Sequence, residues 1–248
     1  MRLTLLGTGG VWAAPVHGCA CVACAAARRD PSRARAPTSA LLEAGGRRYL
    51  IDAGRCDLND RFPPGTLDGV LLTHFHADHA MGLALMRWSM AEPLPVWCPD
   101  DPAGFDDLTR SPGRLRFHHV VPGQELDLGP IRVTAVALSH TRPTLGWVIE
   151  CDGRRLAWLS DTRGLEPATI AALRAARPGL VLLDCAYPAG SPEPRNHNDL
   201  TEAEAILNEL DAPATRLIHV NHELDAALMT GAQQTRHALA RDGEVIAV

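Results

Sequence analysis

The chain has 248 residues, of which 46% are hydrophobic and 21% charged, and its formal net charge is −5 at pH 7. This length and composition predict a globular protein with a sizeable core. The acidic balance and the lack of a long basic run argue against duplex nucleic acid and anionic membranes as partners. The residues before Gly7 are too few for a signal peptide, and no apolar run is long enough to span a membrane, so we expect a cytoplasmic protein.

Short apolar runs bounded by turn residues predict a chain rich in strands. Gly45-Gly46 and Asp152-Gly153 each join two such runs, as in a hairpin. The predicted strands are 3–6, 40–43, 49–51, 70–72, 96–98, 117–121, 131–138, 147–150, 156–159, 180–183, 216–218 and 244–248. The predicted helices are 81–90, 167–177 and 201–210, the last with a capping box if Thr201 is its N-cap residue. Each half of the chain closes with helices, which suggests two similar halves in one domain.

Several of these strands end at a side chain that can bind a metal or transfer a proton. These residues are Asp52, His74, His140, Asp161, Asp184 and His219. Because hydrophobic strands deliver them from their ends, we expect one site at the edge of a sheet sandwich.

The stretch from Thr73 to His79 reads T-H-x-H-x-D-H and directly follows the apolar run 70–72. Its possible metal ligands are His74, His76, Asp78 and His79. Alternate residues of a strand project to one side, and a turn into a helix would bring the last two ligands together. Mixed imidazole and carboxylate ligands favour zinc, manganese or iron over calcium or magnesium. The stretch therefore predicts a metal site.

The chain has seven cysteines, an odd number, and Cys19, Cys21 and Cys24 form a tight cluster. In a reducing compartment such a cluster indicates metal ligation before it indicates disulfides.

The order of these residues resembles the metallo-β-lactamase superfamily. The matching residues are Asp52, His74, His76, Asp78, His79, His140, Asp161 and His219. The resemblance covers nearly the whole chain. It implies an α/β fold of the αββα sandwich type, with two β-sheets flanked by helices, as a single domain over residues 1–248. It also implies a dinuclear metal site between the sheet edges.

The cysteine cluster narrows the resemblance to PhnP-type phosphodiesterases of the carbon–phosphorus lyase pathway of phosphonate breakdown. The segments that carry it are 18–24, the loop 194–197 from Pro194 to His197, and 219–225. Such enzymes hydrolyse 5-phosphoribosyl 1,2-cyclic phosphate to ribose 1,5-bisphosphate and also open 2′,3′-cyclic nucleotides. The resemblance implies a phosphorylated sugar or a cyclic nucleotide as substrate, and a homodimer.

The same resemblance implies two metal sites of different kinds. Two divalent ions, manganese with zinc or iron as alternatives, would occupy the dinuclear site. One would be held by His74, His76 and His140, the other by Asp78, His79 and His219, with Asp161 bridging them. A structural zinc would be held by Cys19, Cys21, Cys24 and His222, tying the loop 17–26 to residues 219–225. The alternative to His219 in the dinuclear site is His222.

His197 and Asp78 are the residues assigned to catalysis. By resemblance His197 is the general acid, because a sugar alkoxide leaves poorly without a proton and such an acid contributes about 10²–10⁴-fold. The neighbouring Arg195 either contacts a phosphate or is solvated. We expect Asp52 and Asp184 to accept hydrogen bonds from ligand imidazoles and so orient them.

Three other functions are compatible with parts of the pattern. A ribonuclease-Z-like enzyme that processes tRNA 3′ ends would need a basic arm, which this acidic chain does not show. A protein similar to the pyrroloquinoline quinone biosynthesis protein B would share the cysteine cluster, but that family lacks the complete H-x-H-x-D-H. A thioester or lactam hydrolase is not expected to carry the Cys₃His pattern or the His197 loop.

Overall fold

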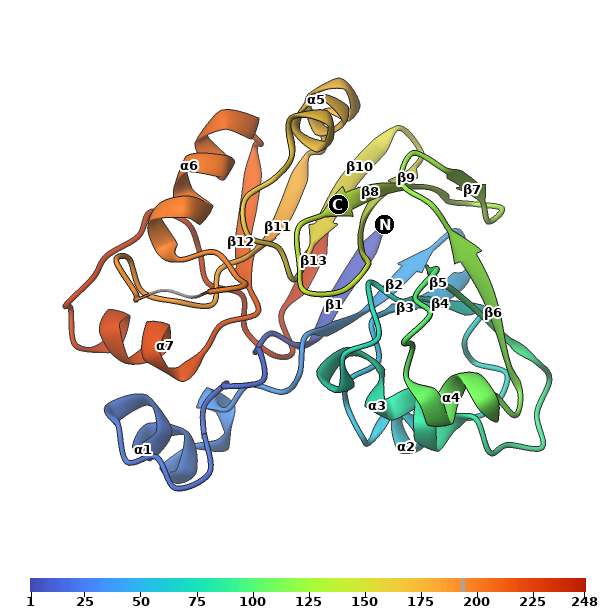
Figure 1. The fold of residues 1–248 in the computed structure, drawn as a ribbon, viewed down its shortest axis with the longest axis horizontal. Coiled ribbons are helices and arrows are strands. Elements are labelled where there is room, and N and C mark those ends of the chain that lie inside the picture. Colours follow the sequence, from blue (N-terminus) through green and yellow to red (C-terminus); the bar gives the residue numbers. More distant parts are fainter. Residues whose placement is uncertain (193–194) are drawn as a thin grey trace.

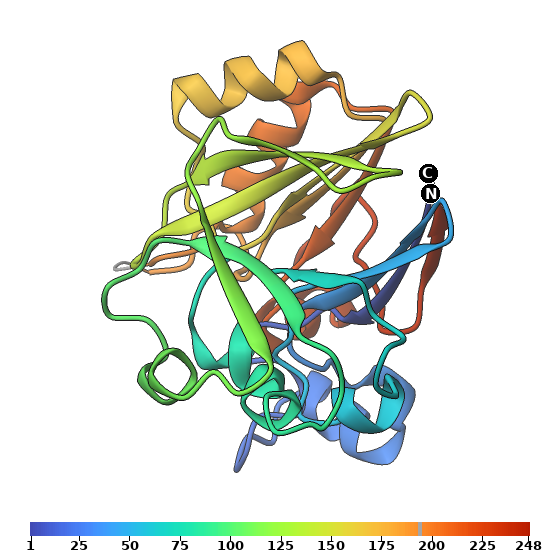
Figure 2. The same cartoon turned by 90° about the vertical axis from the view of Figure 1, so that its right-hand side faces the viewer.

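In the computed structural model, which describes residues 1–192 and 195–248, the strands of these ranges form one seven-stranded and one six-stranded sheet. The first sheet has the order β13-β1-β2-β3-β4-β5-β6, and the second has the order β12-β11-β10-β9-β8-β7. Figures 1 and 2 show the sheets face to face with helices outside them. The predicted αββα sandwich is therefore confirmed.

Both sheets mix parallel and antiparallel neighbours. The strands of the first sheet are β1 Arg2–Gly7, β2 Ser39–Ala44, β3 Arg47–Ile51, β4 Gly69–Leu71, β5 Leu94–Pro99, β6 Leu115–Val120 and β13 Val245–Ala247. Those of the second are β7 Glu125–Asp127, β8 Arg132–Leu138, β9 Thr144–Cys151, β10 Arg154–Leu159, β11 Leu180–Asp184 and β12 Ala214–Ile218. The predicted hairpins at Gly45-Gly46 and Asp152-Gly153 join β2 to β3 and β9 to β10, and all four turn residues have positive φ.

The helices cover the outer faces of the sheets and one end of the sandwich. They are α1 Val22–Arg29, α2 Leu58–Arg61, α3 Ala77–Met86, α4 Asp106–Arg110, α5 Pro167–Ala176, α6 Leu200–Leu210, α7 His222–Met229 and the short 3-10 helix η1 Pro31–Arg33. Helices α2, α3 and α4 lie outside the first sheet, α5 and α6 lie outside the second, and α1 packs beside α7 (Figure 1).

Alternation along the strands explains the layers, because successive side chains point to opposite faces of a sheet. In β10, Leu156 and Trp158 belong to the core between the sheets, whereas Ala157 and Leu159 pack under the helices of the second sheet. Both kinds of position are buried, so these strands appear in the sequence as continuous apolar runs.

The helix predicted at 81–90 was misplaced, since α3 begins at Ala77 and ends at Met86. Gly82 lies inside this helix. A larger residue would not fit there, because a Cβ would come within 2.3 Å of the Arg55 carbonyl oxygen and 2.6 Å of the Ala53 carbonyl oxygen. The capping box of α6 is formed by Asp199 and Glu202, so Thr201 is not its N-cap residue. Helices α1, α2 and α7 and strand β7 were not predicted.

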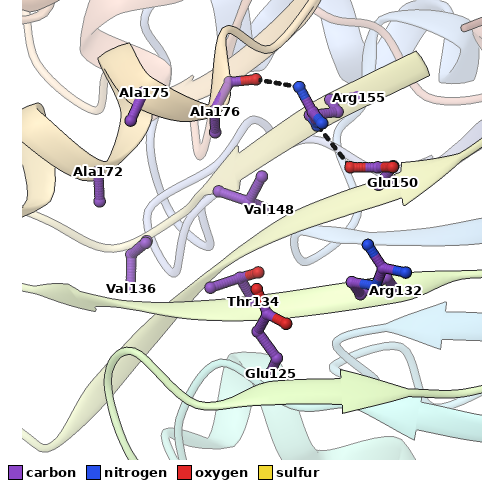
Figure 3. Close-up of a pocket in the computed structure, with 10 residues that line it drawn as sticks. All are labelled: Glu125, Arg132, Thr134, Val136, Val148, Glu150, Arg155, Ala172, Ala175 and Ala176. Carbon is purple, nitrogen blue, oxygen red and sulfur yellow. Dashed lines mark hydrogen bonds and ion pairs between the residues drawn. The ribbon is translucent and has the colours of Figure 1, made fainter. Parts of the chain in front are cut away.

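Arg155 fixes α5 to the second sheet. Its Nε donates to Glu150 Oε2 at 2.6 Å and its Nη1 donates to the Ala176 carbonyl oxygen at 2.9 Å. Figure 3 shows this contact at the rim of a hollow of about 340 Å³ between α5 and strands β7 to β10. The lining residues of the hollow do not include any of the predicted metal ligands. In the described part of the chain, no helix is long and apolar enough to cross a membrane.

Candidate metal centres

Three strand-end residues adopt an unusual backbone conformation at one edge of the sandwich. Asp52, Asp161 and His219 have φ values of 57°, 60° and 60°. A left-handed conformation is costly for residues with a side chain and is concentrated at functional sites. These three side chains are almost fully buried, and each contacts another residue of the predicted site.

The first group of ligands consists of three imidazoles and one carboxylate. His76 Nδ1 lies 2.9 Å from His74 Nε2 and 3.1 Å from His140 Nε2. Asp161 Oδ2 lies 3.6 Å from His74 Nε2 and 3.7 Å from His140 Nε2. His74 and His76 follow β4 of the first sheet, and His140 follows β8 of the second.

The protonation of this group suits metal binding, which requires neutral imidazoles. Burial lowers the pKa of His140 to about 4. Burial also lowers the pKa of His74 and His76 below the ordinary histidine value. Burial raises the pKa of Asp161, but the surrounding His219, His79 and His74 outweigh it, so this carboxylate stays ionised.

The second group consists of Asp78, His79 and His219, again with Asp161. Asp161 Oδ1 lies 3.1 Å from His79 Nε2 and 3.3 Å from His219 Nε2. Asp78 Oδ2 lies 3.5 Å from His219 Nε2 and 3.7 Å from His79 Nε2. Asp161 therefore directs one oxygen to each group, which is the arrangement expected of a carboxylate between two cations.

The start of α3 places two of these ligands. His76 is the N-cap residue, and its carbonyl oxygen accepts from the N–H groups of His79 and Ala80 at 3.0 Å each. Gly54 permits this helix to approach the first sheet, because a Cβ at that position would lie 1.6 Å from the Asp78 carbonyl oxygen.

Asp52 contacts His79: its Oδ2 lies 2.9 Å from Nδ1 of that imidazole. Its Oδ1 accepts from the backbone N–H of Thr73 at 2.8 Å and from the Thr73 hydroxyl at 2.9 Å. Burial lowers the pKa of His79, but Asp161 and Asp52 outweigh it and raise the pKa well above its ordinary value. The role of Thr73 was missed, although its place beside the first histidine of the motif was a usable signal.

His197 lies inside the site and is almost fully buried, although the sequence predicts only a polar loop around it. Its ring stacks on His219 with centroids 4.5 Å apart and lies 4.9 Å from the ring of His140. Its Nδ1 lies 2.6 Å from Asp184 Oδ2. Burial lowers the pKa of His197, but Asp184 outweighs it and raises the pKa to about 9.

Asp184 was expected to orient a metal-ligating imidazole, and the structure pairs it with His197 instead. The reason is the turn after β11, where Asn198 donates to the Asp184 carbonyl oxygen at 3.1 Å and so draws the His197 loop over the strand end. Arg195 of that loop is neither solvated nor aimed into the site. Its guanidinium is buried against Asp199 and Glu202, at 2.6 and 3.3 Å. Pro194 lies outside the described residues.

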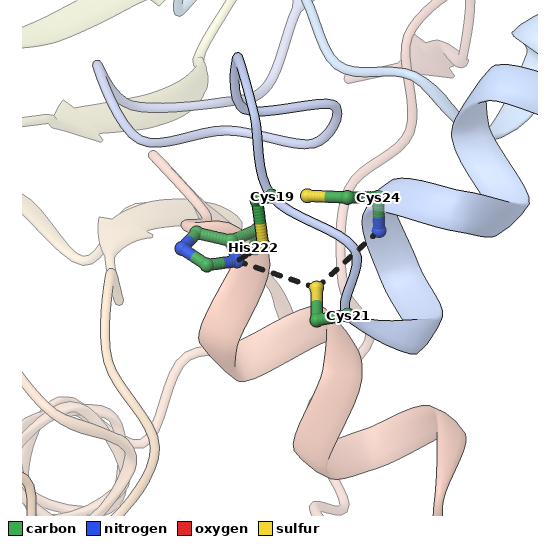
Figure 4. Close-up of side chains that lie close together, drawn as sticks. All are labelled: Cys19, Cys21, Cys24 and His222. Carbon is green, nitrogen blue, oxygen red and sulfur yellow. Dashed lines mark hydrogen bonds between the residues drawn. The ribbon is translucent and has the colours of Figure 1, made fainter.

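The cysteine cluster and His222 lie together at the α1–α7 end of the molecule (Figure 4). His222 Nδ1 lies 3.4 Å from Cys21 Sγ and 3.6 Å from Cys19 Sγ. The three thiols and the imidazole offer ligand atoms within 4.8 Å of one another. All seven cysteines lie in the described ranges and are free thiols.

Buried nitrogen atoms indicate that the second group of ligands fits a metal ion. His79 Nε2 and both ring nitrogens of His219 are buried and make no hydrogen bond of normal geometry to the described residues, although Asp161 Oδ1 lies 3.1 Å from His79 Nε2 and 3.3 Å from His219 Nε2. Such orphaned groups are costly unless a ligand satisfies them. The His/Asp groups supply nitrogen and oxygen ligands for divalent ions, and the Cys₃His group has the donors of a closed tetrahedral zinc site.

The αββα sandwich carries a cluster of His and Asp side chains at its edge that could hold metal ions. The family described as the beta-lactamase superfamily domain matches residues 47–220. The chain therefore belongs to the metallo-β-lactamase superfamily.

Solved structures of similar fold cover almost the whole chain. A diphosphatase from the PhnP family shares 23% identity at a TM-score of 0.78, with 99% of this chain and 97% of that one covered. Zn²⁺-bound PqqB from Methylobacterium extorquens shares 18% identity at a TM-score of 0.79, with both chains fully covered. At these identities the likeness shows the fold alone.

Curated relatives are similar over part of their length. An octanoyltransferase of Porphyromonas gingivalis is 28% identical over 241 residues, which are 90% of this chain and 46% of the relative. A ribonuclease Z of Methanosarcina acetivorans is 25% identical over 164 residues, which are 60% of this chain and 48% of the relative. The chain thus spans about half the length of these relatives.

Proposed function

We propose that this protein is a divalent-metal-dependent phosphodiesterase that hydrolyses cyclic phosphodiesters. The observation that carries the proposal is the buried His197–Asp184 pair, which contacts ligands of both groups of the His/Asp cluster. A cluster that holds cations beside a proton donor suits the opening of a phosphodiester whose leaving group is an alkoxide.

The chain's own residues have distinct tasks in this proposal. When bound at the two groups of ligands, divalent cations lower the pKa of water and stabilise charge on phosphoryl oxygens. Asp184 holds Nδ1 of His197, so Nε2 is the ring nitrogen left to give a proton. In the reaction, water loses one proton to solvent as its oxygen forms a bond to phosphorus. The bond from phosphorus to the sugar oxygen breaks, and His197 protonates that oxygen and then regains a proton from solvent. Asp78 takes part as a ligand of the second group.

We further propose that the substrate is 5-phosphoribosyl 1,2-cyclic phosphate, which would give ribose 1,5-bisphosphate in phosphonate catabolism, with 2′,3′-cyclic nucleotides as additional substrates. The combination of the Cys₃His group with the His197 loop supports this choice, as does the structural likeness to a diphosphatase of the PhnP family. Manganese in the dinuclear site, one zinc in the cysteine site and a homodimer complete the proposal.

Elemental analysis combined with a panel of phosphate esters tests the proposal. We expect two equivalents of divalent metal in addition to one zinc, hydrolysis of 1,2- or 2′,3′-cyclic phosphates, and loss of turnover on chelation. Purified protein with this metal content and no activity on any cyclic phosphodiester would contradict it.

A second candidate is tRNA 3′ processing, which the sequence similarity to ribonuclease Z favours. Cleavage of precursor tRNA at moderate salt, without activity on cyclic phosphates, would select this function. A third is a non-hydrolytic role, which the structural likeness to PqqB supports. Metal confined to one equivalent in the cysteine site would select that role.

A further inference from the structure

Arg142 lies two residues after His140. It links the segments that carry His74, His76 and His140, which are called the three-histidine group below. Its Nη1 donates to the Phe75 carbonyl oxygen at 3.1 Å, between His74 and His76 in the chain. Its Nε donates to Asp101 Oδ2 at 2.8 Å, and its Nη2 donates to the Gly104 carbonyl oxygen at 2.5 Å. The guanidinium thus joins three loops at the edge of the sandwich.

We infer that Arg142 is a positioning residue that holds His140 in register with His74 and His76, and so sets the metal affinity of the three-histidine group. This inference rests on the metal-binding part of the proposed function and does not depend on the substrate. It assigns Arg142 no contact with the metal or with the substrate.

The two sheets make such a link necessary. His74 and His76 follow a strand of the first sheet, whereas His140 follows a strand of the second, so no single element fixes the distances between their nitrogen atoms. The Arg142–Phe75 hydrogen bond crosses this boundary beside the ligands, as does the hydrogen bond from the Leu145 N–H to the Thr73 carbonyl oxygen at 3.0 Å. A misplacement of about 0.5 Å is enough to impair such a site.

Asp101 makes the link rigid. Its Oδ1 accepts from the N–H groups of Ala103 and Gly104 at 3.0 and 3.3 Å, which holds the turn 101–104 in shape. Its Oδ2 takes Arg142, and the side chains of Asp101 and Arg142 are 3% and 20% exposed. A planar guanidinium can satisfy a carboxylate and two carbonyl oxygens at once, which a lysine ammonium cannot do in the same geometry.

The chain offers a matched control in Arg87. This arginine is also buried, and it also donates to a carboxylate oxygen and a backbone carbonyl oxygen, both of Asp107. It lies just after α3, on the outer side of the first sheet, and contacts none of the predicted metal ligands.

Protein stripped of metal at the His/Asp cluster, but retaining its cysteine-bound zinc, is titrated with Co²⁺ and with Mn²⁺. Absorption spectra follow the binding of Co²⁺, and calorimetry measures the affinity for both ions. We expect Arg142→Met to lower the affinity for one of the two metal equivalents by about 10–100-fold. This is the range found when a residue that orients a metal ligand is lost. Arg142→Lys should recover only part of this affinity, and Asp101→Asn should weaken the same equivalent. Arg87→Met should bind both equivalents as wild type does.

Wild-type affinity in folded Arg142→Met, Arg142→Lys and Asp101→Asn protein would overturn the inference, and so would equal losses in Arg142→Met and Arg87→Met. The inference and the proposed function fail differently. A wild-type protein that binds no metal outside the cysteine site would overturn the proposed function itself, whereas unaltered variants of a metal-binding protein overturn only the role of Arg142.

Discussion

The carboxylate of Asp52 holds the imidazole of His79 at 2.9 Å, and both side chains are fully buried. This contact leaves His79 Nε2 facing Asp161 and the second group of ligands. We expect Asp52→Asn to lower the metal affinity of that group by about 10–100-fold, because the partner that orients the ring is replaced by an amide. Calorimetric titration of the metal-free protein measures the change.

Asp68→Asn is the matched control for Asp52→Asn. Asp68 also accepts from a backbone N–H, that of Arg48, and from a side chain, that of Arg47, but it lies away from the His/Asp cluster. Its substitution should leave both metal equivalents unaltered. If Asp52→Asn binds metals as tightly as this control, Asp52 does not orient His79 for metal binding.

Replacing His197 with alanine should separate substrates by their leaving groups. We expect turnover of a cyclic phosphate or another alkyl ester to fall by about 10²–10⁴-fold, the usual contribution of a general acid. A p-nitrophenyl ester should lose far less, because p-nitrophenolate leaves without protonation. The measurement is kcat on both substrates at equal metal content.

Asp184→Asn should follow the same pattern with a smaller loss, since it keeps His197 but removes the carboxylate that holds Nδ1. An equal loss on alkyl and p-nitrophenyl esters in His197→Ala would rule out the general-acid role and leave His197 as part of the site's packing.

Replacing Cys21 with alanine should remove about one zinc per chain and lower the melting temperature. A structural zinc site needs all four of its protein ligands. Cys21 Sγ also accepts from the Cys24 N–H at the start of α1, so the helix loses its N-terminal cap. Metal bound at the His/Asp cluster should remain. Elemental analysis and thermal unfolding of the same sample check both effects.

Cys56→Ala is the control, because Cys56 is an exposed thiol outside the cluster. It should keep the full zinc content and the melting temperature of the wild type. A Cys21→Ala protein that retains its zinc would show that the Cys21 thiol is not a ligand.

Strand ends were predictable because they combine two local signals, an apolar run and the polar residue that stops it. Asp52, His140 and Asp161 were placed in this way, and the structure brings them into one site. The strand content followed equally well from hairpin turns such as Asp152-Gly153. Strand ends and hairpin turns are each recognised from a few consecutive residues, so neither depends on contacts between distant parts of the chain.

Features that depend on distant contacts were not predictable. Gly82 suggested the start of a helix but lies within one, because its neighbour in space is the backbone at Ala53 and Arg55. His197 appeared to be a loop residue, yet Asp184 and the ring of His219 bury it. The role of Arg142 was not predictable because its partners lie about 40 and 70 residues away in the chain.

The buried ion pair between Arg35 and Asp225 should dominate the stability of the region behind the cysteine site. Arg35 Nε and Nη2 contact the two carboxylate oxygens at 2.6 and 2.9 Å, and the side chains are 1% and 5% exposed. Arg35→Met should lower the free energy of unfolding by about 3–5 kcal/mol, because it leaves the buried Asp225 with only the exposed Arg241, 3.7 Å away. Arg110→Met breaks an exposed pair of the same 2.6 Å length and should have little effect. Urea unfolding compares the two variants, and equal midpoints would contradict the expectation, since burial is the property that distinguishes the pairs.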